Sequence, residues 1–509
     1  MRLTWLALAV LVVGCVDDPR DPSTWVKKLG DPREGKEAIS QLVKLKDPKA
    51  VDPLIAQYKK TKDLDVLKAI ASFKDKKQVP TMIDSLEYSE ESFDAAVTAA
   101  NALGETPDPS AVDPLIRVLG KPLPIKTRAN VVKLEAMKSL VKIGDKKAVD
   151  VLVKILETPA DDQDFFLNQV AAQSLGKMAD PKAVPALIRG LFMTGRGANI
   201  FQDTRTALLH IGEPAVDPLV QTLQRKNAKV EEDAKKYEFL PGIVEQKTSI
   251  VLGDLRSKKS VPALLELLAK KDDGAAAGAG KGVSSHQSAL LALGQIGDAS
   301  AGKTLLATLN DTKKNQKERA SAAEALNLLG DTTALPSLLK IAQQKFINGT
   351  TIDAEAGALV ASAATAYSRL ADEGGSNATF PKIPEEIADM NEVFAAAADR
   401  LEVSKSCKKD LPCYVKILTG KDNVKAEKAA FMIARMGKPG LAELAKQVGH
   451  PDPAVRMTVL FGIAHSGDKS NKDCIGALEK QIETDHTKPP LKPIVDEMRA
   501  VLAEISSRA

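Results

Sequence analysis

Apolar residues recur along most of the chain at intervals of about three or four positions, the spacing that lines one face of an α-helix. Residues 136–143 carry one such face, and residues 172–178 carry another. Prolines stand just before or near the start of many of the following apolar segments. A proline is tolerated in the first turn of a helix, where its missing N–H has no partner to lose. The pattern therefore predicts successive α-helices arranged in pairs.

One phrase recurs between the helices of a pair, a turn of the type Gly-Asp-x-x-Ala followed by Val-x-Pro-Leu at the start of the second helix. Copies or close variants occupy residues 45–55, 143–153, 178–188 and 329–339. The turn glycine suits a helix C-terminus that needs a left-handed residue. A phrase that repeats every 20–50 residues or so indicates a solenoid. The sequence predicts an all-α fold, an α-solenoid of stacked antiparallel helix pairs.

The repeated phrase resembles that of HEAT repeats, in particular the short HEAT-like class of the phycobilisome lyases. The resemblance covers residues 35–505 and implies an armadillo-like superhelix. In that family an aspartate of the turn and an arginine early in a first helix often form a ladder between repeats. Asp452 with Arg456, and Glu318 with Arg319, match this usage, and the resemblance implies that their role is structural.

The regularity of the phrase sets the expected domain boundaries. HEAT-like repeats cover residues 35–372, an irregular break covers residues 373–390, and C-terminal HEAT-like repeats cover residues 391–505. The break is either a hinge between two arrays or a set of loop insertions on one edge of the solenoid. A charged insert at residues 225–247 is expected to lengthen a helix, and the glycine-rich residues 272–285 are expected to form a flexible loop.

The N-terminal sequence has the features of a targeting signal. Residues 3–13 form an apolar stretch that is too short to span a bilayer but suits the core of a signal peptide. The stretch ends Val-Val-Gly-Cys at Cys15, which resembles the bacterial lipobox. The resemblance implies that the Cys15 thiol receives a diacylglycerol and that the chain is cut before it. The alternative is an ordinary secretory signal with a chance cysteine at its end.

The lipobox interpretation defines two N-terminal segments and predicts where the protein is located in the cell. Residues 1–14 are then a lipoprotein signal peptide, and the polar, proline-rich residues 15–34 are a tether. The residue after the cysteine is Val16 rather than aspartate, which by resemblance to enteric sorting indicates the outer membrane. We therefore expect a lipid-anchored protein of the bacterial cell envelope, at the outer membrane and facing the periplasm.

Export makes disulfides permissible. Cys407 and Cys413 are six residues apart across a turn between two helical segments, so we expect them to form a disulfide. Cys474 would then be unpaired and buried. Pairing of Cys413 with Cys474 is the alternative, although it would have to bridge an intervening repeat. A zinc site has little support, because these cysteines have no histidine nearby.

Charge and composition bear on the class of partner. The chain has 71 Lys+Arg against 67 Asp+Glu, and its net charge is +4. A nucleic-acid binder would show a strong basic excess or a dense basic stripe. Lys258 with Lys259, an isolated pair, is expected to be a solvated helix end. Aromatic residues make up only 4% of the sequence, which suits closely stacked helices.

No catalytic motif accompanies the repeats. The five histidines are not followed by glutamate, so the His-Glu-x-x-His metal motif is missing, and the HEAT-like di-iron hydroxylases, which need His-Glu pairs, are disfavoured. The sequence also has neither a phosphate-binding Gly-x-x-x-x-Gly-Lys-Ser/Thr loop nor a Gly-x-Ser-x-Gly elbow. We therefore expect no catalytic residues, no metal and no cofactor.

These observations favour a non-enzymatic, membrane-anchored scaffold or adaptor. Its expected partners are proteins of the cell envelope, with the membrane reached through the N-terminal lipid and with no nucleic acid. The alternative is a HEAT-like lyase or a protein that binds a small molecule or chromophore. The charge balance and the N-terminal signal-like sequence both argue against a nucleic-acid-binding HEAT-like protein. Fold alone does not assign function, so the preference depends on location and chemistry.

Overall fold

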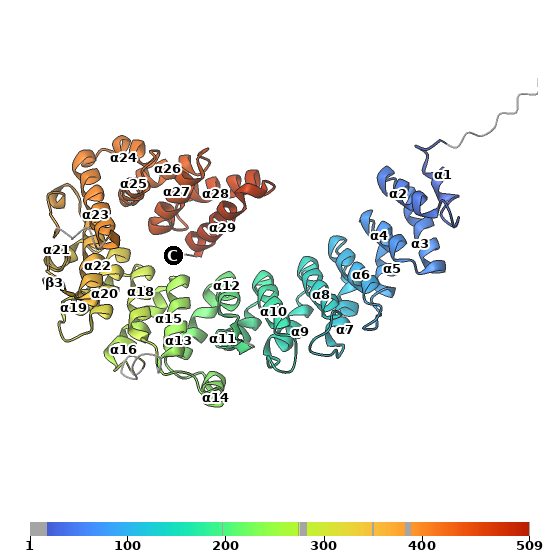
Figure 1. Cartoon of the computed structure of the whole chain (residues 1–509), viewed down its shortest axis with the longest axis horizontal. Helices are drawn as coiled ribbons and strands as arrows, with labels where there is room; N and C mark the ends of the chain where they lie inside the picture. Colours follow the sequence, from blue (N-terminus) through green and yellow to red (C-terminus); the bar gives the residue numbers. More distant parts are fainter. Residues whose placement is uncertain are drawn as a thin grey trace, which may run out of the picture. The chain divides into compact units, whose positions relative to one another are not determined.

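The computed structural model describes residues 18–195, 197–272, 274, 282–348, 351–381 and 388–507. These residues are predominantly α-helical, with successive helices joined by short turns (Figure 1). The chain divides into two compact units. Unit 1 comprises Met1–Ala186 with Met193–Asp203, and unit 2 comprises Leu187–Phe192 with Thr204–Ala509.

Unit 1 is a stack of helix pairs, several of them joined by a 3₁₀ turn. Its elements are α1 (Pro22–Val26), α2 (Gly35–Leu45), η1 (Pro48–Ala50), α3 (Val51–Thr61), α4 (Leu64–Ser72), η2 (Lys76–Gln78), α5 (Val79–Asp84), α6 (Asp94–Glu105), η3 (Pro109–Ala111), α7 (Val112–Gly120), α8 (Asn130–Ile143), α9 (Lys147–Glu157), α10 (Phe165–Met178), η4 (Pro181–Ala183), β1 (Thr194–Gly195) and β2 (Ala198–Asn199). The two short strands pair antiparallel, with Thr194 opposite Asn199. Helices α11 (Val184–Gly190) and α12 (Phe201–Ile211) each have residues in both units.

Unit 2 continues the same arrangement. Its elements are η5 (Glu213–Ala215), α13 (Val216–Leu223), α14 (Ala228–Lys236), α15 (Ile243–Leu255), η6 (Lys258–Ser260), α16 (Val261–Ala269), α18 (Ser285–Ile296), η7 (Ala299–Ala301), α19 (Gly302–Asn310), α20 (Gln316–Leu329), η8 (Thr332–Ala334), α21 (Leu335–Ala342), β3 (Ile347–Asn348), β4 (Thr351–Ile352), α22 (Ala354–Leu370), η9 (Glu373–Gly375), α23 (Ala388–Cys407), α24 (Leu411–Leu418), α25 (Asn423–Arg435), α26 (Lys438–Gln447), α27 (Pro453–Ser466), α28 (Lys472–Asp485), η10 (Pro489–Leu491) and α29 (Lys492–Ser507). Strands β3 and β4 pair antiparallel, with Ile347 opposite Ile352. None of the helices in the described part of the chain is both long and apolar enough to cross a bilayer.

The aspartate of the repeated phrase has a local role in the structure. It precedes a 3₁₀ turn, and its carboxylate accepts a hydrogen bond from the backbone N–H two residues later, which satisfies a donor that the turn leaves free. This cap is found at Asp47, Asp75, Asp108, Asp180, Asp298 and Asp331. The residue before it usually ends the first helix in the left-handed region. It is a glycine at Gly297 and Gly330, with φ of 74° and 76°, and a non-glycine residue with φ of about 50° at Lys46, Lys74 and Ala179. The phrase therefore encodes the corner of each repeat.

Repeats stack through the first helices of neighbouring pairs, and small residues let the helices approach closely. Gly294 of α18 faces α20, and a Cβ placed on it would lie 2.6 Å from both the Cα and the carbonyl oxygen of Ala325. Ala322, Ala323 and Ala325 on the facing helix are fully buried. The backbones of α18 and α20 therefore contact each other directly at Gly294 and Ala325, and a larger residue has no space there.

Gly294→Ala is expected to destabilise unit 2 by about 1–3 kcal/mol, because the added methyl group must push α18 away from α20. The change lowers the midpoint of thermal unfolding followed by circular dichroism. Gly476→Ala in α28 is the matched control, since nothing lies within 4 Å of a Cβ at that position. There the higher helix propensity of alanine should be neutral or stabilising. Equal unfolding midpoints for the two variants would contradict the packing argument.

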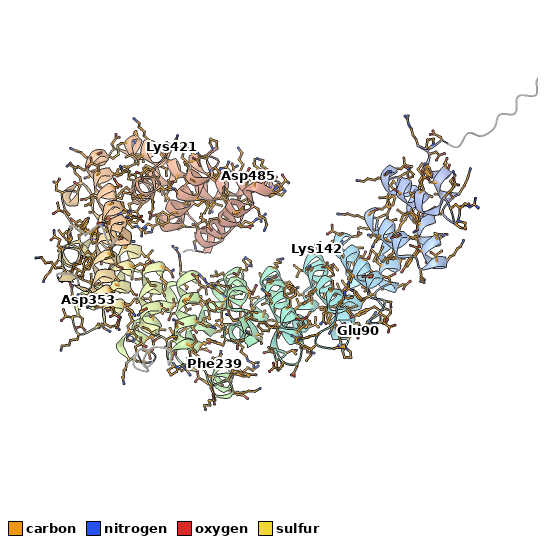
Figure 2. All side chains as sticks on the ribbon, in the orientation of Figure 1. Glu90, Lys142, Phe239, Asp353, Lys421 and Asp485 are labelled. Carbon is orange, nitrogen blue, oxygen red and sulfur yellow. A yellow bond between two sulfur atoms is a disulfide. The ribbon has the colours of Figure 1, made fainter. Side chains whose placement is uncertain are left out.

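Charged residues also connect successive repeats in unit 1. Glu105, at the end of α6, accepts hydrogen bonds from Lys74 at 2.7 Å and from Lys142, which Figure 2 labels near the end of α8. Hydrogen bonds from Lys142 and Lys74 lower the pKa of Glu105 to about 2. The carboxylate therefore stays ionised at any pH near neutral. Because all three side chains are partly exposed, each pair adds little to stability, on the order of 0.2–1 kcal/mol.

Three segments differ from the sequence-based expectations or lie largely outside the described residues. The structure corrects the extent of the tether expected at residues 15–34, because α1 packs against α2, leaving Thr24 and Leu29 at 5% and 7% exposed. The reason is local: Asp21 caps α1, and Trp25 Nε1 donates a hydrogen bond to the Pro19 carbonyl oxygen at 2.9 Å. The charged insert at residues 225–247 forms the separate helix α14 instead of lengthening a neighbour. The loop expected at residues 272–285 lies largely outside the described residues.

Candidate functional site

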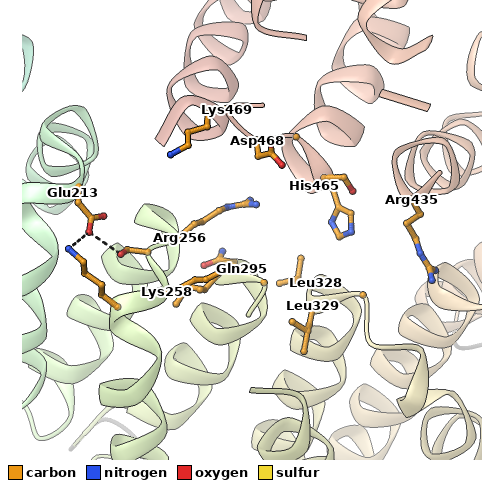
Figure 3. A pocket seen from close by; sticks show the side chains of 17 residues that line it. Glu213, Arg256, Lys258, Gln295, Leu328, Leu329, Arg435, His465, Asp468 and Lys469 are labelled. Carbon is orange, nitrogen blue, oxygen red and sulfur yellow. Dashed lines mark hydrogen bonds and ion pairs between the residues drawn. The ribbon is translucent and has the colours of Figure 1, made fainter. Parts of the chain in front are cut away.

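A cleft of about 670 Å³ lies within unit 2, where the ends of α25 and α27 approach the ends of α15, α18 and α20 (Figure 3). The lining residues come from the turns that follow these helices, including Gly297, Gly330 and Gly467. The cleft therefore brings together repeats that are far apart in sequence. A helix C-terminus carries partial negative charge on its unpaired carbonyl groups, so cations are favoured where several such ends meet.

Basic residues outnumber acidic residues in the lining. Arg256, Lys258 and Lys259 come from the connection between α15 and α16, Arg435 comes from the end of α25, and Lys469 follows α27. The acidic residues of the lining are Glu213 and Asp468. The cations enter the cleft from both walls, as Figure 3 shows for Arg256 and Lys469.

Arg256 and Arg435 each donate a hydrogen bond to a backbone carbonyl group near the end of a helix, and so each acts as a structural brace. Arg256 ends α15 in the left-handed conformation, and its Nη1 donates a hydrogen bond to the carbonyl oxygen of Ala464 in α27 at 3.2 Å. Arg435 Nη1 donates to the carbonyl oxygen of Leu370 at the end of α22 at 3.1 Å. Burial lowers the pKa of Arg435. Each guanidinium therefore neutralises a helix C-terminus, and the Arg256 brace joins the two walls of the cleft.

The lysines of the cleft differ in their partners. Lys259 Nζ forms an exposed ion pair with Glu213 Oε1 at 2.8 Å, and Ser257 Oγ also binds that oxygen. Among the described residues, Lys258 and Lys469 form no ion pair within 4.0 Å. Lys258 belongs to the pair expected from the sequence to be a solvated helix end, and the structure places it at the edge of the cleft. The positive charge available to a ligand therefore comes chiefly from Lys258 and Lys469.

An apolar stripe on α27 leads to the cleft. Met457, Phe461 and His465 are four residues apart and so share one face of the helix. Met457 is 43% exposed and Phe461 is 38% exposed, which places them among the few exposed large apolar side chains of the described residues. His465 lines the cleft, and its ring centroid lies 4.6 Å from that of Phe431. The cleft therefore has cations on its walls, and the exposed apolar stripe of α27 leads to it.

A buried lysine supports the wall that carries Arg435. Lys428 of α25 is fully buried, and its Nζ donates hydrogen bonds to the carbonyl oxygens of Arg369 at 2.6 Å and Ala371 at 2.8 Å. Burial, reinforced by Arg435 and Arg400, lowers the pKa of Lys428 to about 7. The amine therefore satisfies the last carbonyl groups of α22 and fixes α25 against that helix.

The cysteines of the C-terminal repeats are placed as follows. Cys407, the last residue of α23, and Cys413 of α24 form a disulfide with Cα atoms 5.4 Å apart. These are the two cysteines whose pairing the sequence spacing favours. Cys474 is fully buried and unbridged in α28, and its Sγ donates to the Leu441 carbonyl oxygen at 3.4 Å. Burial raises the pKa of the Cys474 thiol to about 11, so it is an inert packing residue.

Replacing Cys407 and Cys413 together by serine is expected to lower stability by about 2 kcal/mol, since the bridge closes a short loop and restricts the unfolded chain. Urea unfolding of the oxidised wild type and the double variant measures the difference. The same two residues should be recovered as a disulfide when peptides are mapped from protein trapped in intact cells. Recovery of both as free thiols would contradict the expected oxidation.

The expected lipid anchor and one histidine that the sequence predicts to be structural complete the survey of these residues. Cys15, the expected lipid anchor, lies outside the described residues. His286, only 3% exposed, places its Nδ1 3.0 Å from Glu318 Oε1, a pair that joins α18 to α20. Burial alone would raise the pKa of Glu318, but hydrogen bonds from His286 and Lys314 lower it. Within the described part of the chain, no group of three or more His, Cys, Asp or Glu residues is placed to hold a metal ion.

Comparison with known proteins gives a family and several solved structures. A family model described as HEAT repeats matches residues 79–164 and 124–195. The CpcE–CpcF complex of phycocyanin lyase from Nostoc sp. PCC7120 is similar at 22% identity and a TM-score of 0.26, over 58% of this chain and 94% of that chain. The Kap95:Nup1 complex is similar at 12% identity and a TM-score of 0.43, over 93% of this chain and 70% of that chain. Human deoxyhypusine hydroxylase in complex with glycerol is similar at 16% identity and a TM-score of 0.18, over 69% of this chain and 96% of that chain. No curated protein matches the chain.

Proposed function

We propose that this chain, which its family match and its stacked helix pairs identify as a HEAT-repeat α-solenoid, is a lipid-anchored, non-enzymatic scaffold of the bacterial cell envelope. The observation that carries the proposal is the cleft of unit 2. Its lining comes from the turns of several repeats and mixes charged, polar and apolar groups. Stacked repeats expose replaceable residues on an extended surface, which suits contact with another protein chain.

The cell-envelope part of the proposal is supported by the N-terminal sequence. The apolar residues 3–13 and the Val-Val-Gly-Cys ending at Cys15 have the order of a lipoprotein signal. Several acyl chains on one N-terminal cysteine would anchor the protein stably, whereas a single chain anchors only marginally. Val16 supports placement at the outer membrane, with the repeats facing the periplasm.

In-cell crosslinking of a C-terminally tagged chain, followed by affinity purification and mass spectrometry, tests the scaffold function. The expected result is one or two envelope proteins recovered in stoichiometric amounts from the membrane fraction. A variant with Arg256→Glu should recover less of them, because it removes the brace between the two walls of the cleft. Recovery of a bound small molecule or chromophore, without a protein partner, would contradict the proposal and favour a lyase or ligand carrier.

A further inference from the structure

We propose, on the basis of the scaffold function, that the cleft of unit 2 binds an extended acidic segment of the partner protein, with a large apolar side chain of that segment packed on Met457 and Phe461 of α27. Two independent features of the surface carry this inference. The first is the excess of cations in the lining, and the second is the exposed apolar stripe that continues it.

Some cations of the cleft are already paired within the protein, and others are available to a ligand. Arg256 and Arg435 are committed to backbone carbonyl groups at helix ends, so they offset the partial negative charge of those ends. Lys259 is neutralised by Glu213. Lys258 and Lys469 remain on opposite walls without an ion pair among the described residues, and Figure 3 shows both at the cleft. A ligand that places carboxylates between these walls would meet positive charge on each side.

The acids near this surface do not cancel that charge. The carboxylate of Asp468 accepts a hydrogen bond from the Ser470 backbone N–H at 2.7 Å, and Glu213 is bound by Lys259 and Ser257. Asp298 is the other nearby carboxylate, and Lys258 contributes to the lowering of its pKa after the hydrogen bonds from Ser300. Asp298 therefore stays ionised and offsets part of the positive charge of Lys258. Its main contacts, however, are the hydrogen bonds from Ser300 in its own turn.

The exposed apolar stripe favours a peptide as the ligand. From Met457 to His465 the stripe covers eight residue-to-residue steps of the helix, a length of roughly 12 Å. An extended peptide rises about 3.3 Å per residue, so about four residues could lie along the stripe. Aromatic and other large side chains, placed in a pocket surrounded by polar groups, are typical anchors of protein interfaces. A nucleic acid would instead require a denser set of cations along its backbone.

Fluorescence anisotropy of the full-length protein in detergent provides the test. The probe is a labelled ten-residue peptide of aspartate and glutamate with one central phenylalanine, and its control carries asparagine and glutamine in place of the acids. We expect saturable binding of the acidic peptide only. Lys258→Glu with Lys469→Glu should weaken that binding by about tenfold or more, and Phe461→Ser should weaken it by about tenfold.

Lys421→Glu is the matched control, because Lys421 is an exposed lysine of the same unit that does not line the cleft (Figure 2). It should leave the affinity within about twofold of wild type.

Equal binding of both peptides, equal weakening by Lys421→Glu, or cleft-dependent binding of a single-stranded oligonucleotide instead of the peptide would each overturn the inference. If the peptide fails while crosslinking still recovers envelope partners, the inference fails and the scaffold function stands. If the peptide binds but no protein partner is recovered in cells, the scaffold function fails.

Discussion

Replacing Cys15 by serine is expected to remove the protein from the membrane fraction or to leave an uncleaved precursor, with loss of all palmitate label. The expected change is nearly complete, because each buried methylene of an acyl chain contributes about 0.8 kcal/mol to membrane binding and a lipoprotein carries several such chains. The described remainder of the chain has no helix that is long and apolar enough to cross a bilayer. Metabolic labelling and fractionation of the two strains measure the outcome.

The control for this experiment is the Cys407→Ser/Cys413→Ser variant, which removes two cysteines but keeps the Val-Val-Gly-Cys sequence. It should label with palmitate and sediment with membranes as the wild type does. If Cys15→Ser itself labels like the wild type, the lipobox interpretation is wrong. Release of unlabelled, processed protein by the wild type would instead indicate an ordinary secretory signal, the alternative that the sequence leaves open.

The repeat architecture was predictable because the information for it is local. The all-α fold of stacked helices is confirmed by the described helices, and the HEAT repeats are confirmed by the family match over residues 79–195. The turn glycine and aspartate at residues 144–145 and 330–331 act through hydrogen bonds to backbone atoms a few residues away. Such contacts repeat with the sequence phrase, so the phrase alone reveals them.

The cleft was not predictable in the same way. Arg256 bonds to Ala464, which lies 208 residues further along the chain, and neither residue belongs to the repeated phrase. Lys428 is likewise a lysine of a helix that would ordinarily be exposed, yet it is buried by the end of α22. These contacts depend on how the repeats of unit 2 curve, which results from many small differences in packing. Adjacent charged residues in the sequence therefore do not indicate which lysines share a surface in the folded protein.

Asp485→Asn is expected to have the largest effect on stability among the substitutions considered. Asp485, at the end of α28, is 1% exposed and accepts hydrogen bonds from Arg456 Nη1 at 2.6 Å, Gln481 Nε2 at 2.7 Å and Lys488 Nζ at 2.8 Å. Arg456 also donates to the carbonyl oxygen of His450, before α27. The carboxylate thus joins two helices of one repeat to the turn that follows them.

Removal of that charge leaves the Arg456 guanidinium, 9% exposed as a side chain, without its buried partner. Breaking a buried pair in this way costs on the order of 3 kcal/mol or more. Hydrogen exchange of the amides in α27 and α28 should then accelerate by about a hundredfold, since about 1.4 kcal/mol corresponds to a factor of ten. Asp496→Asn is the control: Asp496 is 51% exposed as a side chain, and its ion pairs with Lys492 and Arg499 should matter little.

The pH dependence gives an independent check on the same residue. Burial alone would raise the pKa of Asp485, but hydrogen bonds from Lys488, Gln481 and Arg456 hold it below the usual value of 3.8. A carboxyl group whose pKa is lower in the folded state contributes stability above its unfolded pKa and loses it as the pH falls through the folded pKa. The difference between wild type and Asp485→Asn should therefore be full near pH 7 and should shrink below about pH 4. A difference that stays constant down to pH 3 would show that the substitution acts through packing, and that the charge of Asp485 does not hold the last repeats together.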